Sequence, residues 1–123
     1  MAKHEFSFRH GLMFGKGKDA EPQYDVVLRE LTSADLIDAA MEAERVVFVD
    51  EGKKAIAYTS EVLYGFELLR RQISSVGEIQ GPLTFKQLRQ LHPDDLQTLQ
   101  DETEKLDGLI KGVSERGRDV PAE

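Results

Sequence analysis

The chain has 123 residues, and its 16 basic and 23 acidic side chains give a formal net charge of -7. That charge disfavours nucleic acid as a partner, because a phosphate backbone would be repelled. The chain contains no cysteine, which excludes disulfides, thiolate metal sites and cysteine nucleophiles. No apolar run approaches the roughly 20 residues that cross a bilayer, and the start lacks the pattern of a signal peptide. We therefore expect a cytoplasmic protein that has no membrane partner.

Two segments near the N-terminus have the alternating pattern of β-strands. Residues 5–14 alternate weakly, with Phe6, Phe8 and Leu12 on one side, and residues 24–30 repeat the pattern with Tyr24, Val26 and Leu28. The segment between them, GKGKDAEPQ, is rich in turn-forming and charged residues. This pattern predicts a hairpin, and its apolar face should rest on helices because an isolated hairpin is barely stable in water.

A first helix is predicted to begin at Thr32. Thr32 can act as the N-cap, and Asp35 three residues later completes an acidic capping box. An apolar stripe then follows at helical spacing, formed by Leu36, Ile37, Ala40, Ala43 and Val47. We expect this stripe to face the core.

The run VVFVDEGKKAIAY at residues 46–58 fits two conformations. Its β-branched and aromatic residues favour strands, and the central DEGK could form the turn of a second hairpin. The alternative is an irregular loop after the first helix. We favour the loop.

A second helix is predicted from Ser60 to about Ser75, with Gly77 as its stop. Its apolar residues occupy more than one side, so one side could be offered to a partner. Core packing remains the commoner role for any single one of them. The candidates for partner binding are Leu63, Tyr64, Phe66, Leu68 and Ile73.

Two further helices are predicted after the turn at Gly81-Pro82. Thr84 and Gln87 form a capping box for a short helix. A long helix starts with Pro93 in its first turn and carries the apolar stripe Leu96, Leu99, Thr103, Leu106 and Ile110. We expect it to end at Gly108 or Gly112.

The predictions combine into one α+β domain over residues 1–112: a small N-terminal β-hairpin packed on about three α-helices. Residues 113–123 have little to bury and should form a flexible, disordered C-terminal tail. Exposed stripes and the hairpin edge could also support self-association, although the sequence sets no number of copies.

Acidic side chains are concentrated on the last helix, and basic ones precede it at Arg70, Arg71, Lys86 and Arg89. Such segregation can fix the register between packed elements or select a partner by sign. A solvated acidic helix face is the commoner explanation.

The motifs of catalysis and ligand binding are not matched. The loop at Gly11 to Gly17 has neither the length nor the hydroxyl of a P-loop. His4, His10 and His92 lack the spacing of a metal site, although distant residues could still assemble one. The carboxylates cluster on polar helix faces, where they would stay ionised, and no nucleophile elbow is present. We therefore expect no catalytic residues, no cofactor, no metal and no enzyme.

The chain resembles the tail assembly chaperones of Mu-like phages and prophages. The resemblance covers roughly residues 24–108 and is carried by LRELTSAD at residues 28–35, by RRQISSVGEIQGPL at residues 70–83 and by LHPDDLQTL at residues 91–99. The order and spacing of these segments are specific to the family. Each segment alone is only a capped helix with the residues that precede it.

The resemblance implies a non-enzymatic protein that acts during tail morphogenesis in the host bacterial cytoplasm. It would bind the apolar, helical tape measure protein, keep it soluble, help recruit tail tube subunits and be absent from the mature virion. The alternatives are a minor structural protein of the tail and a protein-interaction adaptor. A groove for an amphipathic helix would fit the chaperone role.

Overall fold

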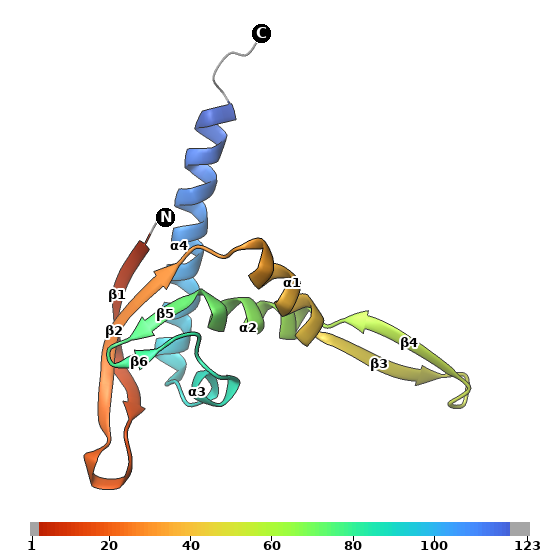
Figure 1. Cartoon of the computed structure of the whole chain (residues 1–123), viewed down its shortest axis with the longest axis horizontal. Helices are drawn as coiled ribbons and strands as arrows, with labels where there is room; N and C mark the ends of the chain where they lie inside the picture. Colours follow the sequence, from red (N-terminus) through yellow and green to blue (C-terminus); the bar gives the residue numbers. More distant parts are fainter. Residues whose placement is uncertain (1–2, 119–123) are drawn as a thin grey trace.

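The computed structural model describes the backbone of residues 3–118 and the side chains of residues 4–108. An α+β architecture results, as the sequence predicts (Figure 1). In chain order its elements are β1 (Lys3–Phe14), the 3-10 helix η1 (Gly17–Asp19), β2 (Glu21–Arg29), α1 (Ser33–Glu42), β3 (Glu44–Val49), β4 (Lys54–Thr59), α2 (Glu61–Gln72), β5 (Ile73–Val76), β6 (Ile79–Gln80), α3 (Phe85–Arg89) and α4 (Pro93–Arg118).

The main sheet has four antiparallel strands in the order β1-β2-β5-β6. Its first two strands are the predicted N-terminal hairpin, with Phe6 opposite Val26, and their register shifts between Ser7 and Leu12. Helix α4 lies along β1 (Figure 1). The apolar core fills the space between the sheet and the helices and includes Phe8, Leu12, Val26, Leu28, Ile73, Val76, Leu83, Leu99 and Leu106.

The predicted helix starts are confirmed because they depend on local chemistry. The Thr32 hydroxyl accepts the Asp35 N–H, and the Asp35 carboxylate accepts the Thr32 N–H in return. Thr84 and Gln87 form the same reciprocal pair at α3. These contacts satisfy amide donors that have no partner inside the helix.

The predicted second helix is too long. Helix α2 ends at Gln72, and residues 73–76 form strand β5, which pairs with β2 so that Val76 lies opposite Val26. Gly77, expected as the helix stop, instead turns the chain from β5 to β6 with a φ of +56°. Pairing with a distant strand offers this short apolar segment more burial than another helical turn would.

The predicted end of α4 is also wrong, because the helix continues past Gly108 and Gly112 to Arg118. A glycine inside a helix costs only about 1 kcal/mol relative to alanine, so it does not by itself end one. The predicted tail from residue 113 is therefore helical as far as Arg118, and residues 119–123 lie outside the described part of the chain.

Residues 46–58, predicted as a loop, belong instead to a second hairpin. Strands β3 and β4 pair from Glu44–Thr59 to Val49–Lys54, and the turn uses positive φ angles at Asp50, Glu51 and Gly52. The preference of the β-branched residues for strands therefore determines the conformation of residues 46–58. At its base, the Ser60 N–H donates to the Ala43 carbonyl at 2.9 Å. The hairpin stands away from the rest of the molecule (Figure 1), and we call it the β3–β4 arm.

The stripe predicted for α1 is mostly exposed to solvent. Ala39 and Ala43 are fully buried, but Leu36 is 43% exposed and Ile37 is 60% exposed. The expectation that both large residues face the core is therefore wrong. Helix α1 lies beside α2 (Figure 1), and only its small side chains are fully buried, whereas Leu36 and Ile37 remain exposed.

Candidate partner-binding surface

Helix α2 is fixed in the fold at both ends. At its start, the Ser60 hydroxyl accepts the Leu63 N–H at 3.3 Å. Near its end the buried Glu67 carboxylate binds the guanidinium groups of Arg70 and Arg71. Arg70 also donates to the Leu83 carbonyl at 3.2 Å, which attaches the helix to the segment before α3. A buried carboxylate needs such partners, so this group holds the orientation of α2.

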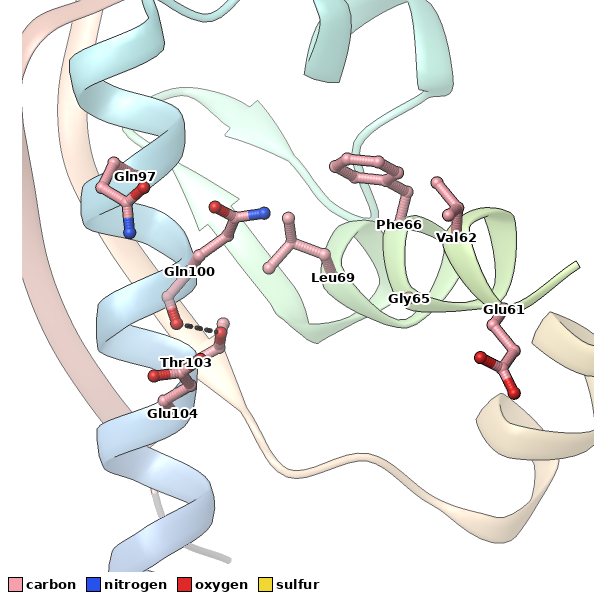
Figure 2. A pocket seen from close by; sticks show the side chains of 9 residues that line it. All are labelled: Glu61, Val62, Gly65, Phe66, Leu69, Gln97, Gln100, Thr103 and Glu104. Carbon is pink, nitrogen blue, oxygen red and sulfur yellow. Dashed lines mark hydrogen bonds between the residues drawn. The ribbon is translucent and has the colours of Figure 1, made fainter.

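A groove of about 440 Å³ separates α2 from α4 (Figure 2). Its α2 side is apolar except for Glu61 at the start of the helix, and its α4 side is polar and acidic. Val62 is 73% exposed at the edge, and a side chain added at Gly65 would meet nothing within 4 Å. In Figure 2, Leu69 and Gln100 point toward each other across the space. The lining residues are Glu61, Val62, Gly65, Phe66, Leu69, Gln97, Gln100, Thr103 and Glu104.

A second hollow of about 230 Å³ lies beside the first and is more apolar. It is lined by Phe66, Phe85, Leu88, Arg89 and Leu96. The rings of Phe66 and Phe85 meet edge to face, with centroids 6.4 Å apart. Phe66 thus borders both hollows, and we call the two together the Phe66 groove. An open groove with one apolar side is suited to an amphipathic helix.

The structure separates the five residues predicted to bind a partner. Phe66 lines both hollows. Leu63, Tyr64 and Leu68 are half-buried and do not line either hollow. Ile73 is fully buried at the start of β5, so it belongs to the core and offers no surface to a partner.

The predicted binding residues did not include Val62, Leu69 or Leu96, which also line the groove. The spacing of the α2 stripe did contain the signal, because Val62, Phe66 and Leu69 share one helix face. It did not show that α4 lies far enough from this face to leave it open.

A second apolar surface lies on the β3–β4 arm, where every residue from 44 to 59 is exposed. The large apolar side chains involved are Val46, Val47, Phe48, Val49, Ile56 and Tyr58, of which Phe48 is 70% exposed. Patches of this kind on an otherwise charged protein mark interaction sites.

The charge segregation seen in the sequence does not pair α4 with the basic residues before it. Arg70 and Arg71 bind Glu67 on their own helix instead. Asp95 is fully buried and accepts backbone N–H groups of Arg9, His10 and Gly11, a role that the sequence did not reveal. Glu104 remains exposed beside the Phe66 groove.

The side chains of His10, His92 and Asp94 come together where β1 approaches the start of α4. One ligand atom each from His10, His92 and Asp94 lies within 4.8 Å of the others. The two imidazole rings are stacked, with centroids 3.6 Å apart and planes inclined by 12°. Nearly parallel rings direct their nitrogen lone pairs alongside each other, so a shared ion would require one ring to turn.

The described residues form an α+β domain with two exposed apolar surfaces, the Phe66 groove and the β3–β4 arm. No helix in the described part of the chain is both long and apolar enough to cross a membrane. Residues 8–118 match the family described as tail assembly protein gp41. The chain belongs to this family of phage tail assembly proteins.

The chain is also similar in sequence to individual phage and prophage proteins. The chain is 46% identical over 112 residues to the probable tail assembly protein gp41 of Escherichia phage Mu, covering 89% of this chain and 76% of the relative. It is 54% identical over 86 residues to the Mu-like prophage FluMu protein gp41 of Haemophilus influenzae, covering 70% and 64%. With the probable tail assembly protein FS-gp41 of phage Mu it shares 46% identity over 111 residues, spanning 58% of that longer protein. No solved structure matches.

Proposed function

We propose that this protein is a non-enzymatic tail assembly chaperone that binds the tape measure protein through the Phe66 groove. It keeps this partner soluble and helps recruit tail tube subunits. It acts in the host bacterial cytoplasm and does not remain in the finished virion. Family membership supplies the role in tail assembly, and the groove supplies a surface for an apolar helical partner.

The open groove on α2 is the observation that carries this proposal. Val62 and Phe66 present apolar surface beside Gln97 and Gln100, and such a border suits a helix with one apolar and one polar side. The net charge of -7 supports the chaperone role, because repulsion between loaded copies opposes aggregation.

Buried ionisable groups support binding over catalysis. The carboxylates of Glu67 and Asp95 are buried, but each is held by several donors from its own chain. Groups engaged in this way stabilise the fold, whereas a catalytic acid or base needs access to substrate.

Co-expression with the tape measure protein of the same phage or prophage tests the proposal. We expect the wild-type chain to raise the soluble fraction of the tape measure protein and to co-purify with it. Val62→Glu places a charge at the apolar edge of the groove and should abolish both effects. Because Val62 is 73% exposed, the variant should keep its fold.

The matched control is Val47→Glu, which makes the same change on the β3–β4 arm and should leave the complex intact. An equally insoluble tape measure protein with and without this chain would contradict the proposal. Mass spectrometry of purified particles tests the remaining part. Stoichiometric retention of this chain in the virion would favour the minor structural protein instead.

A further inference from the structure

We propose that the β3–β4 arm is a self-association surface, on which one face of the hairpin packs against the same face of a second copy. The inference does not depend on what fills the Phe66 groove. It rests on the exposure of the arm, the arrangement of its side chains and its charge.

The arm has no apolar cover of its own. It is a separate two-stranded sheet, and none of its residues from 44 to 59 is buried or half-buried. A lone two-stranded hairpin is at best marginally stable in water, and three or more strands or a packed face are needed to stabilise it. A partner surface is therefore expected to cover this arm.

The strand register divides the arm into two faces. Directly opposed residues share a face, and the faces alternate along each strand. The pairs Val46–Ala57 and Phe48–Ala55 therefore lie on one face, which we call the alanine face. The pairs Arg45–Tyr58, Val47–Ile56 and Val49–Lys54 lie on the other, the cationic face.

The alanine face is complementary to itself. Its bulky residues, Val46 and Phe48, stand on β3, and its small residues, Ala55 and Ala57, stand opposite on β4. A two-fold axis parallel to the strands would lay β3 of each copy over β4 of the other. Each bulky side chain would then fill the space above an alanine, as close packing of two sheets requires.

Charge also favours a second copy at the arm. Three acidic and three basic side chains cancel within residues 44–59, so the net charge of -7 belongs to the rest of the chain. Contact between two arms therefore adds no repulsion between net charges at the contact itself. The six charged residues of the arm are Glu44, Asp50, Glu51, Arg45, Lys53 and Lys54.

The cationic face is the poorer surface for self-association. It carries Arg45 and Lys54 with no acidic residue between them, so two such faces would bring like charges together. The alanine face has only Glu44 at its base. The face that packs against a second copy is thus assigned by its shape and by its lack of charge.

Sedimentation velocity of the full chain over a range of micromolar concentrations tests the inference. The wild type should form a reversible dimer. Val46→Glu, on the alanine face, should raise the dimer dissociation constant by roughly tenfold or more. Val47→Glu makes the same change at the neighbouring residue on the cationic face and should leave the dissociation constant unchanged. Circular dichroism and thermal unfolding verify that both variants fold.

A wild type that stays monomeric throughout, or an equal effect of the two variants, would overturn the inference. A monomeric wild type whose tape measure complex requires Val46 would assign the arm to that partner instead.

Cysteine cross-linking gives a second measurement, because the chain has no cysteine of its own. Phe48→Cys and Ala55→Cys are made in separate samples, mixed and treated with a short bis-maleimide, because packed sheets lie about 10 Å apart, beyond the reach of a disulfide. We expect more cross-linked dimer in the mixture than in either sample alone, because residue 48 of one copy lies over residue 55 of the other. No excess in the mixture would contradict the packing.

Discussion

The Asp95 carboxylate in the first turn of α4 accepts the backbone N–H of Gly11 in β1, with 3.0 Å between the two atoms. It also accepts the N–H groups of Arg9 at 2.8 Å and His10 at 3.1 Å. Asp95 is fully buried, and the three donors lie where β1 shifts its register against β2. Charge-assisted hydrogen bonds of this kind offset the cost of burying the carboxylate. The contact fastens α4, one wall of the Phe66 groove, to the sheet.

Asp95→Asn should destabilise the protein by about 2–4 kcal/mol, because an amide has one acceptor oxygen and turns an N–H₂ group toward the same donors. Urea unfolding measures the change. Asp94→Asn is the control, since that side chain is 63% exposed and its loss should change stability by less than about 0.5 kcal/mol. Equal effects of the two variants would contradict the assigned role of Asp95.

Gly11→Ala should destabilise the fold by about 1–3 kcal/mol, because Gly11 has a φ of +87° and an added Cβ would lie 3.0 Å from both the Pro22 side chain and the Tyr24 ring. Gly52 in the arm has the same φ, but a Cβ there would meet nothing within 4 Å. Gly52→Ala thus measures the cost of placing alanine at this positive φ alone, without a steric clash. In thermal unfolding, Gly11→Ala should lower the midpoint more. The reverse order would show that β1 adjusts freely at this point.

Glu67→Gln should lower the free energy of unfolding by about 2–3 kcal/mol, because it leaves Arg70 and Arg71 without the charge that holds them. Both guanidinium groups bind the Glu67 carboxylate on α2. Glu51→Gln, at the exposed tip of the arm, is the matched control. Chemical denaturation compares the two variants. An unchanged midpoint for Glu67→Gln would mean that the ion-pair group does not stabilise α2.

Asp35 should make stability depend on acid pH. A hydrogen bond from Arg29 is the main cause that holds the pKa of the Asp35 carboxyl well below its ordinary 3.8, and the Thr32 hydrogen bonds lower it further. A depressed pKa in the folded state means that this stabilisation is complete above the ordinary value and is lost as the pH falls below it.

Asp35→Asn should therefore cost about 1–2 kcal/mol at neutral pH, and its difference from the wild type should shrink below pH 3.8. Denaturation at neutral pH and at about pH 3 measures both values. Asp38→Asn, at an exposed position of the same helix, should show neither effect. A constant difference across this range would contradict the pairing with Arg29.

Features set by neighbouring residues were predictable from the sequence. The capping boxes at Thr32 and Thr84 and the start of α4 at Pro93 each depend on side chains within one helical turn. Alternation predicted the N-terminal hairpin for the same reason. The sequence pattern therefore located most helix starts correctly.

Features set by distant contacts were not predictable. Strand β5 exists because Val76 pairs with Val26. Asp95 is buried because it packs against the register shift of β1, a segment that is distant from it in the sequence. The exposure of Ile37 and Val62 depends on how α1 and α2 pack against their neighbours. Of the predicted site residues, Phe66 lines the groove because α4 leaves its helix face open, and Ile73 does not because it is buried in the core.

Hydrogen–deuterium exchange on the co-purified complex with the tape measure protein tests the central claim most directly. The account predicts slower exchange, relative to the free chain, in residues 61–69 of α2 and residues 97–104 of α4, with no such change in β1 or β2. The Val62→Glu variant, mixed with the tape measure protein, should not gain that protection. Protection confined to other elements, or a complex that forms without any change in α2 and α4, would contradict binding through the Phe66 groove.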